Sequence, residues 1–362
     1  MKTWLPAVLC AVLLITAAGA ERNLCYAQSN SSDMLYAEQN PEKYTYEDMQ
    51  SDIAALQKKY DPYFSVHSLG KTADGRELYD LVIGSEEAER KIFINGGIHA
   101  REYITCQLVM KQAASFLEHA ARGDDYEHHS DGEAADQEGG ALQTVSYREM
   151  WENCQIHVMP MVNPDGTAIS QNGLEGIQTE EMRTKVIGIA SLDGQQAEGE
   201  YLVNWKSNGC GIDLNRNFDA LWDSYEDPAG HPSSAYYKGS YPGSEEESAA
   251  MIALTEEQKF DRTISYHAQG GVIYWYFGQE GTLYDDTKQL GERIAAVTGY
   301  TMDADYQSLD PAGYKDWAIS KEGIPSLTIE IGHDTVPVPE EQFDEIWEQN
   351  KNVWEECVLD TL

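Results

Sequence analysis

A short apolar segment that ends in two glycines and leads directly into a long helical pattern limits the folds open to this chain. Residues 91–95 are typical of a buried strand, Gly96-Gly97 ends it, and residues 101–121 repeat apolar side chains at helical spacing. A strand, a tight break and a helix in this order form the unit from which parallel sheets are built. The sequence therefore predicts an α/β fold.

The other periodic segments extend this unit into one large domain. Helices are predicted at 46–60, 245–258, 285–298 and 339–357, and strands at 65–69, 77–83, 155–162, 262–266 and 326–331. The chain has 362 residues, 41% of them hydrophobic, which is enough for one large core. We expect a single catalytic domain at 44–362, with a mixed, mostly parallel central sheet flanked by helices.

The N-terminal segment has the pattern of a signal for export. Lys2 precedes an apolar run at residues 5–18, and Ala18-Gly19-Ala20 fits a small-residue cleavage site. We interpret residues 1–20 as a cleaved signal peptide, with an uncleaved anchor as the alternative, and residues 21–43 as a polar linker. The mature protein is then predicted to be secreted or on the exterior of the cell envelope, without a membrane span.

The charge of the chain excludes two classes of partner. The formal net charge is −37, with 62 acidic against 25 basic residues. Such a surface repels nucleic acid phosphates and anionic lipids. We therefore expect neither nucleic acid nor membrane partners.

An acidic segment interrupts the periodic pattern between two predicted elements. Residues 123–144 are rich in Gly, Asp and Glu and lack hydrophobic periodicity, which predicts an exposed insertion. Its His128-His129 pair has no spaced metal-ligand partners, so a solvated loop is the preferred interpretation.

The cysteines do not define a metal site. Five remain after signal cleavage, namely Cys25, Cys106, Cys154, Cys210 and Cys357. They form no C-x-x-C pair, which leaves a thiolate zinc ribbon unsupported, and their odd number leaves at least one thiol unpaired. Disulfide connectivity does not follow from this spacing.

Four side chains capable of metal chemistry follow or end three of the predicted strands. His99 and Glu102 come after the strand at 91–95, His267 ends the strand at 262–266, and Glu330 lies near the end of the strand at 326–331. The carboxyl edge of an open α/β sheet is where ligands bind. Two His and one Glu, with a fourth position left open, form an established set for a hydrolytic zinc ion. The sequence thus predicts a zinc site with a carboxylate beside it; a core histidine and a surface acid are the alternatives for His267 and Glu330.

Seven segments, in order, carry a resemblance to a known family. They are Gly70-Lys71-Thr72-Ala73-Asp74-Gly75-Arg76, Gly97-Ile98-His99-Ala100-Arg101-Glu102, Asn163-Pro164-Asp165-Gly166, Gly211-Ile212-Asp213-Leu214-Asn215-Arg216-Asn217-Phe218, Ser265-Tyr266-His267, Asp316-Trp317 and Thr328-Ile329-Glu330-Ile331. Residues 44–352 resemble the zinc carboxypeptidase family, which has the carboxypeptidase A-like fold. The resemblance implies a zinc peptidase that binds one Zn²⁺.

The resemblance also implies a role for each matching residue. His99, Glu102 and His267 match the zinc ligands. Glu330 matches the carboxylate that accepts a proton from the attacking water and passes it to the leaving nitrogen, which is sound chemistry for a general base.

Further matches concern the substrate and the transition state. Asn215 and Arg216 match the pair that binds the terminal carboxylate, for which the planar fork of Arg is suited; a structural Arg is the alternative. Lys206 stands after Trp205 where the family has a transition-state arginine, and a Lys offers a point charge without bidentate geometry. Tyr306 is the nearest match to the substrate-capping tyrosine, displaced by two residues, and equally fits a core aromatic.

Lys315 occupies the specificity position before Asp316-Trp317, where an ammonium group disfavours basic side chains and attracts a carboxylate. A plain surface Lys is the alternative. The chain resembles most closely the bacterial γ-D-glutamyl-meso-diaminopimelate peptidases of cell-wall metabolism, through three segments: Trp205-Lys206-x-Asn208, Gly313-Tyr314-Lys315-Asp316-Trp317, and the tail Glu330-Ile331-Gly332 through Pro337-Val338-Pro339 to Phe343 and Ile346-Trp347.

The expected function is hydrolysis of a peptide bond near a free C-terminus, in a peptide or muropeptide, with the γ-D-glutamyl-diaminopimelate bond of stem peptides as the leading substrate. One alternative is a general metallocarboxypeptidase that removes acidic or neutral C-terminal residues. A non-catalytic relative that binds peptide or cell wall is the alternative from another class, and it predicts the loss of a ligand or base, whereas all four residues are present.

Overall fold

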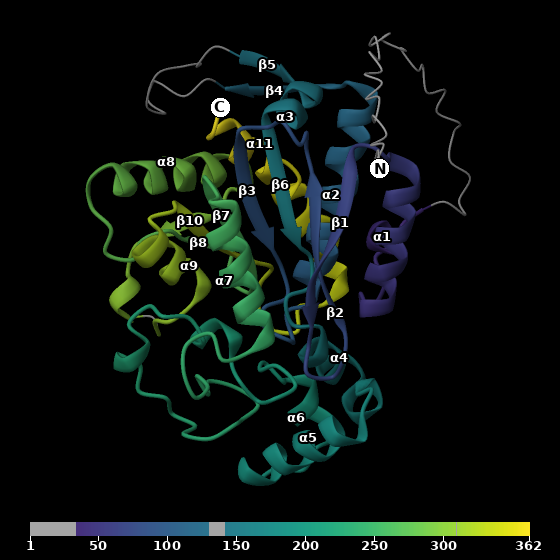
Figure 1. Cartoon of the computed structure of the whole chain (residues 1–362), viewed down its shortest axis with the longest axis vertical. Helices are drawn as coiled ribbons and strands as arrows, with labels where there is room; N and C mark the ends of the chain where they lie inside the picture. Colours follow the sequence, from purple (N-terminus) through teal and green to yellow (C-terminus); the bar gives the residue numbers. More distant parts are fainter. Residues whose placement is uncertain (1–33, 130–141, 309) are drawn as a thin grey trace, which may run out of the picture. The chain divides into compact units, whose positions relative to one another are not determined.

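An eight-stranded mixed sheet forms the centre of the protein (Figure 1). The computed structural model describes residues 34–129, 142–308 and 310–362. The strands, in spatial order, are β1 (Phe64–Lys71), β2 (Glu77–Ile83), β6 (Cys154–Met159), β3 (Arg90–Asn95), β7 (Arg262–Ala268), β10 (Ser326–Ile331), β8 (Val272–Tyr274) and β9 (Thr301–Asp303). The four central strands β6, β3, β7 and β10 are parallel, and β8 pairs parallel with β9; β1–β2, β2–β6 and β10–β8 are antiparallel. The predicted fold class is confirmed.

Eleven α-helices in the described residues flank this sheet and extend beyond its edge. They are α1 (Tyr46–Tyr60), α2 (Ile104–Arg122), α3 (Tyr147–Asn153), α4 (Pro164–Asn172), α5 (Glu180–Leu192), α6 (Gly199–Val203), α7 (Glu246–Gln258), α8 (Gly281–Thr298), α9 (Tyr314–Trp317), α10 (Phe343–Asn350) and α11 (Val353–Leu359). In Figure 1, α5 and α6 lie below the strands. They bury their apolar faces against α4 in a cluster of their own.

The sheet separates two larger buried clusters, as the alternation of β3 shows. Ile92 and Ile94 belong to the cluster that α1, α2, α10 and α11 complete, whereas Phe93 belongs to the cluster with α7 and α9. Successive side chains of a strand point to opposite faces, so a strand buried on both faces is apolar throughout. The core is therefore divided between the two faces of one sheet.

The helix after β3 begins later than the sequence predicts, and the difference matters for the site. We expected a helix from residue 101, but α2 begins at Ile104, so residues 96–103 form a loop. Thr105 stabilises this loop, because its hydroxyl accepts from the Gly97 N–H at 2.8 Å and donates to the Glu102 carbonyl at 2.7 Å. His99 and Glu102 consequently lie in a loop at the end of the strand.

The predicted polar linker 21–43 is wrong in its described part. Residues Leu35–Leu362 form one compact unit, and Ala37 is fully buried. The backbone N–H groups of Tyr36 and Ala37 donate to the Asp52 carboxylate in α1 at 2.7 and 2.9 Å. The composition of this segment does not predict these contacts, because their donors are backbone N–H groups, which every residue except proline has. The predicted signal peptide lies outside the described residues.

The acidic insertion contains structure that its composition does not indicate. β4 (Asp125–His129) and β5 (Leu142–Ser146) pair as a separate antiparallel hairpin, and residues 130–141 lie outside the described residues. Tyr126 is buried and donates to Glu356 of α11 at 2.8 Å, which connects the hairpin to the domain. Among the described residues, the groups of three potential metal ligands do not include His128.

The C-terminal helix and one end of the sheet also differ from expectation. The helix predicted at 339–357 is a 3₁₀ turn followed by α10 and α11, which are separated near Asn350. The Asn350 side chain is buried and donates to Tyr300 at 2.9 Å, a contact that sequence periodicity does not register. The short strands β8 and β9, of which β9 is the edge strand, were not predicted.

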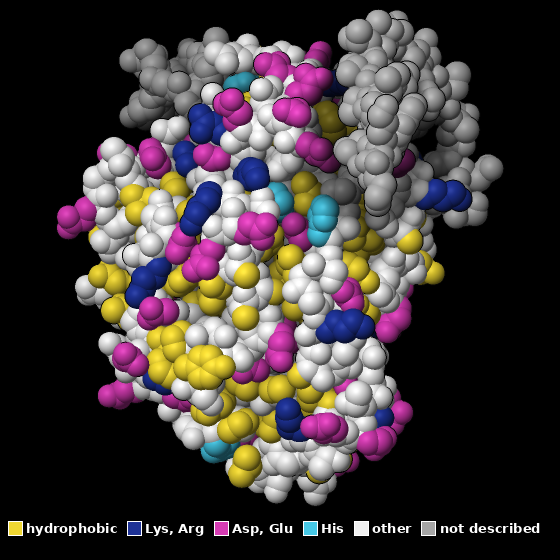
Figure 2. Space-filling model, in the orientation of Figure 1, with side chains coloured by type: hydrophobic (Ala, Val, Ile, Leu, Met, Phe, Trp, Pro, Cys, Tyr) yellow, Lys and Arg dark blue, Asp and Glu magenta, His cyan; other side chains and the backbone are white. Residues whose placement is uncertain are grey.

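The described part of the chain has an acidic surface and free cysteines. Acidic side chains are scattered over the face seen in Figure 2. In the part of the chain that the structure describes, helices fall short of the length and apolarity needed to cross a membrane. Cys106, Cys154, Cys210 and Cys357 are free thiols, and Cys25 lies outside the described residues.

Candidate active site

The loop between β3 and α2 and the two neighbouring strands β7 and β10 supply the residues of the site. His99 and Glu102 come from the loop, His267 from β7 and Glu330 from β10. In the parallel pairing of β7 with β10, Glu330 lies opposite His267. Gly97 has a φ of +66°, and a Cβ there would collide with the Cys106 sulfur, so the turn that leads to His99 requires glycine.

Three of these side chains point their donor atoms at one another. The His99 Nδ1 lies 2.8 Å from Glu102 Oε1, the His267 Nδ1 lies 3.0 Å from Glu102 Oε2, and the two Nδ1 atoms are 3.1 Å apart. All three residues are buried. Their ligand atoms lie within 4.8 Å of one another, as a metal site requires. The structure therefore brings together the three predicted ligands.

The charges of this cluster suit a cation. Burial by itself raises the pKa of Glu102, but His99 and His267 outweigh it and hold that pKa well below its usual range. Burial lowers the pKa of His99, which favours the neutral imidazole; at His267 burial acts in the same direction, but Glu102 outweighs it and raises the pKa, so a metal would displace a proton there. A metal needs ionised carboxylate and neutral imidazole ligands. Two nitrogens and a carboxylate that converge in this way fit zinc, whose ligand nitrogens lie about 2.0–2.1 Å from the ion.

Asp213 lies behind His99 and orients it. Its Oδ1 is 3.3 Å from the His99 Nε2, the ring nitrogen that faces away from the cluster, and its Oδ2 accepts from the Lys206 ammonium at 2.9 Å. Asp213 is fully buried; burial favours its neutral form, but Lys206 and His99 hold the pKa of Asp213 well below its usual range. A carboxylate on the outer nitrogen of a ligating histidine fixes the ring and its tautomer. Our sequence reasoning did not assign this role to Asp213, although it precedes the Asn215-Arg216 pair.

Glu330 lies beside the cluster on the wall of the cavity. Burial raises the pKa of Glu330 to about 7, against the attraction of His267. A carboxylate with a pKa near neutrality exchanges a proton readily in both directions. This is the property that a general base requires when it later returns the proton to a leaving group.

The cavity in front of these residues has a volume of about 340 Å³ and contains the other predicted site residues. Lys206, Asn215, Arg216, Tyr306 and Lys315 all line it. The structure therefore brings together every site residue that the sequence predicts.

Arg216 and Asn215 occupy a short 3₁₀ turn at the edge of this cavity. The Arg216 guanidinium lies over the Tyr225 ring, 5.6 Å from its centroid, and 3.6 Å from the Asp310 carboxylate. Asn215 Oδ1 accepts from the Tyr314 N–H at 3.1 Å, which connects the turn to α9. Asp310 has no counterpart in the motifs, and only the structure reveals it at the site.

Lys315 and Tyr306 form another part of the wall. Lys315 is buried, and its ammonium lies 2.6 Å from Asp316 Oδ1 and 5.3 Å from the Phe277 ring centroid. The interpretation of Lys315 as a plain surface residue is therefore wrong. Tyr306 is half-buried against the rings of Tyr276 and Phe277, with centroids 5.3 and 5.4 Å away.

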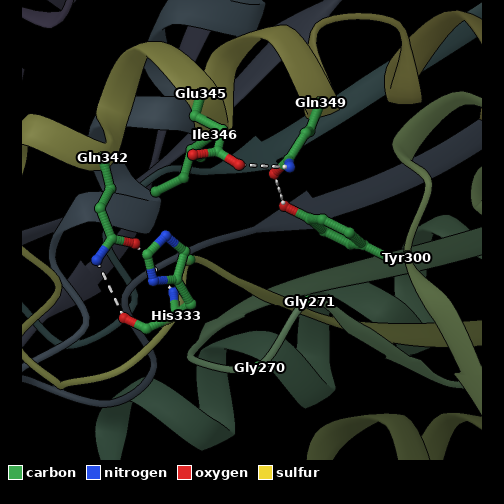
Figure 3. Close-up of a pocket in the computed structure, with 9 residues that line it drawn as sticks. Gly270, Gly271, Tyr300, His333, Gln342, Glu345, Ile346 and Gln349 are labelled. Carbon is green, nitrogen blue, oxygen red and sulfur yellow. Dashed lines mark hydrogen bonds between the residues drawn. The ribbon is translucent and has the colours of Figure 1, made fainter.

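A second, smaller pocket of about 160 Å³ contains none of the predicted site residues (Figure 3). It lies where the chain continues beyond β7 and β10, at Gly270 and Gly332. The Gln342 side chain lines it and bonds the backbone of His333: its oxygen accepts from the His333 N–H and its nitrogen donates to the His333 carbonyl. The amide oxygen and the amide nitrogen of Gln342 thereby each have a backbone partner.

Comparison with known proteins gives the same assignment as this geometry. The family model described as zinc carboxypeptidase matches residues 49–353. The chain is 29% identical over 310 residues to a protein named γ-D-glutamyl-L-diamino acid endopeptidase 1 from Lysinibacillus sphaericus, covering 85% of this chain and 70% of that protein. It is 26% identical to bovine carboxypeptidase O over 334 residues, which cover 86% of this chain and 75% of the relative.

Solved structures show the same fold. Bovine thrombin-activatable fibrinolysis inhibitor, in a complex with tick carboxypeptidase inhibitor, superposes with a TM-score of 0.65 at 18% identity, covering 90% of this chain and all of that one. A carboxypeptidase A from Helicoverpa armigera gives a TM-score of 0.60 at 18% identity, over 87% of this chain and 73% of that one. With a converged His-Glu-His cluster and a family match over most of its length, the chain belongs to the zinc carboxypeptidase family and is a zinc metallopeptidase.

Proposed function

We propose that this peptidase hydrolyses the γ-D-glutamyl-diaminopimelate bond of cell-wall stem peptides, next to a free C-terminus. The observation that carries the proposal is the pair of cationic side chains, Arg216 and Lys315, on the wall of the cavity that also contains the metal ligands. Diaminopimelate has one carboxylate on its main chain and a second on its side chain, so it offers a partner to each. The name of the Lysinibacillus relative, which specifies a diamino acid, supports the same class of substrate.

Different residues of the site bind the substrate and transfer the proton. Arg216 and Asn215 bind the main-chain carboxylate of the terminal residue, which sets the distance from that end to the bond that breaks. His99, Glu102 and His267 would hold the zinc ion, which would supply a Lewis acid for the carbonyl and lower the pKa of a water molecule. Glu330 accepts the proton of the attacking water and returns it to the leaving nitrogen, because it lies on the cavity wall opposite the ligand His267. Lys206 lines the same cavity as a positive charge near the developing oxyanion.

A general metallocarboxypeptidase that removes acidic or neutral C-terminal residues is the second candidate. It is supported by the relatives that are named carboxypeptidases, such as bovine carboxypeptidase O. Both candidates use the same ligands and base, so only the substrate distinguishes them. A non-catalytic binding relative is disfavoured because the ligands, the base and the carboxylate-binding pair all line or adjoin one cavity.

The decisive experiment offers both classes of substrate to the purified zinc protein. L-Ala-γ-D-Glu-meso-diaminopimelate and a panel of N-blocked dipeptides with normal α-peptide bonds are incubated with and without a chelator, and the products are identified by mass spectrometry. We expect release of free diaminopimelate, blocked by the chelator and restored by zinc. Cleavage of the α-linked dipeptides with no release of diaminopimelate would favour the general carboxypeptidase instead.

We also propose that the protein acts outside the cytoplasm, on the basis of the signal-like pattern at residues 1–20. Expression in a bacterial host followed by fractionation and N-terminal sequencing tests it. We expect exported protein that begins at Glu21. Uncleaved protein retained in the cytoplasm would overturn the proposal without affecting the assignment as a peptidase.

A further inference from the structure

The ammonium group of Lys315 is not an isolated charge in the cavity. Asp316, its neighbour in the chain, lies 2.6 Å from it, and both residues line the cavity. The two residues are 8% and 7% exposed, so the charges face each other in a largely water-excluded place. The cavity wall therefore presents an ion pair rather than a single cation.

Each member of the pair retains capacity for another partner. The Lys315 ammonium has three donors, of which one is directed to Asp316 Oδ1 and one to the Tyr276 carbonyl at 3.4 Å. The Asp316 carboxylate accepts from Lys315 on Oδ1 and from the Gly313 N–H on Oδ2 at 3.2 Å. A carboxylate offers about four acceptor positions, so Asp316 also has acceptor capacity left.

We propose that the Lys315–Asp316 pair recognises a substrate side chain that ends in both a carboxylate and an ammonium group. The substrate carboxylate binds the remaining donor of Lys315, and the substrate ammonium binds Asp316. This proposal rests on the proposed function and refines it, because it makes the second amino group of a diamino dicarboxylic acid a recognised feature.

The energetics of burial favour a side chain with both charges. A side chain that brings only a carboxylate adds a net negative charge next to Asp316 and competes with it for Lys315. One that brings only an ammonium adds a positive charge next to Lys315. Unpaired charges in a water-excluded site are costly, whereas two opposed ion pairs leave none. A neutral side chain displaces water from the ion pair and does not replace the hydrogen bonds that the water made.

The pair is separate from the group that binds the main-chain carboxylate. Arg216 lies 3.6 Å from the Asp310 carboxylate and over Tyr225, whereas Asp213 and Asp316 act on it only through their charges. Asp310 also lines the cavity, but its side chain is 52% exposed, and its ion pair is with Arg216, whereas that of Lys315 is with Asp316. This gives a matched control, because Asp310→Asn removes a carboxylate from the same cavity without touching the Lys315–Asp316 pair.

The test uses four substrates that share the L-Ala-γ-D-Glu portion and differ only in the terminal residue. Diaminopimelate carries both side-chain charges, 2-aminopimelate only the carboxylate, lysine only the ammonium, and norleucine neither. For the wild-type zinc enzyme we expect kcat/KM for diaminopimelate to exceed each of the others by about 10- to 100-fold, the value of a hydrogen bond to a charged group. Equal rates with diaminopimelate and 2-aminopimelate overturn the inference, and this result needs no variant.

Three variants then assign the discrimination to residues. Asp316→Asn keeps an acceptor for Gly313 but loses the charge, and should abolish the preference for diaminopimelate over 2-aminopimelate. Lys315→Met should abolish the preference for diaminopimelate over lysine. Asp310→Asn should retain both ratios. Zinc content and melting temperature are measured for each variant, and ratios within one protein are unaffected by a loss of active fraction.

Failure of this inference is distinguishable from failure of the proposed function. If the wild-type enzyme cleaves only α-linked dipeptides, the proposed function fails, and the same four terminal residues are then tested on an α-linked donor. A preference for the doubly charged residue there supports the ion-pair recognition by itself. No preference on either donor overturns it.

Discussion

Glu330 and His267 lie directly opposite each other on the adjacent parallel strands β10 and β7. Partner residues in a sheet project their side chains to the same face, so the pairing register alone places the carboxylate next to a metal ligand. A shift of one residue in β10 would turn Glu330 to the opposite face. The register of the central sheet thus sets the position of the base relative to one of the three ligands, His267.

Replacement of Glu330 by Gln should remove the base without disturbing the ligands. We expect kcat/KM to fall by about 10²- to 10⁴-fold, the usual contribution of a positioned acid–base group. Zinc content should stay at one ion per chain, as measured by atomic absorption. A variant that retains more than a tenth of the activity with full zinc would show that another group accepts the proton.

Removal of zinc should inactivate the enzyme and lower its stability. A ligand that binds only the folded chain stabilises it by about 4 kcal/mol when its concentration is a thousand times its dissociation constant. We expect the melting temperature to fall with chelator and to recover with zinc. His99→Ala should behave like the chelated protein and show no response to added zinc, whereas a variant at His128 should melt like the wild type. A chelator without effect on melting would contradict the site.

Asp213→Asn should weaken zinc binding although Asp213 does not contact the ion. The carboxylate orients His99 from a distance of 3.3 Å, and such partners contribute about 10- to 100-fold to metal affinity. Competition with a chromophoric chelator gives the zinc dissociation constant directly. Unchanged affinity would restrict Asp213 to its ion pair with Lys206.

Arg216→Ala should affect binding of the substrate rather than of the metal. Loss of charge-assisted hydrogen bonds to a carboxylate costs about 1.5–3 kcal/mol, equivalent to roughly 10- to 150-fold in kcat/KM. Arg216→Lys should recover only part of this, because an ammonium lacks the planar fork. The same loss on a substrate whose terminal carboxylate is amidated would show that Arg216 does not bind that group.

The raised pKa of the buried Glu247 leads us to expect that the stability of the protein depends on pH. It is 1% exposed, and burial together with the charge of Asp165 raises the pKa of Glu247 to about 8 from 4.5. A carboxyl group with a raised pKa in the folded chain binds its proton more tightly when folded. Its contribution to stability is therefore complete below pH 4.5 and is lost as the pH rises toward 8.

We expect Glu247→Gln to be more stable than the wild type at pH 9, by on the order of a few kcal/mol, and similar to it at pH 4.5. Urea unfolding at several pH values measures the difference. Glu355, whose pKa burial raises to about 7, remains in both proteins and cancels in the comparison. Parallel curves for the two proteins over the whole pH range would contradict the prediction.

The sequence was sufficient for features that rest on local pattern. The alternation of β3 and the helical spacing of α1 gave correct elements, and the motifs around His99, His267 and Glu330 gave residues that meet at one place. Contacts of backbone N–H groups with a distant side chain were not predictable, such as those of Tyr36 and Ala37 with the Asp52 carboxylate. They depend on hydrogen bonds that leave no periodicity in the sequence.

The substrate side of the site shows the same limit. The position of Lys315 before Asp316-Trp317 predicted that it lies in the pocket. The ion pair between Lys315 and Asp316 could not be predicted, because it depends on the conformation of the short helix α9. Asp310 belongs to no motif and lies near Arg216 because of the path of the chain between β9 and α9. Charged side chains that tertiary structure brings near a motif residue change which substrate groups that residue can bind.

The metal ligands and the base are carried by the interior of the sheet and the loop beside it, whereas Lys315, Asp316 and Asp310 are carried by the stretch between β9 and β10. Substitutions in that stretch can change which terminal residue is accepted while the reaction centre keeps its form. Engineering of a new substrate selectivity should therefore substitute residues in this stretch and keep the sheet unchanged.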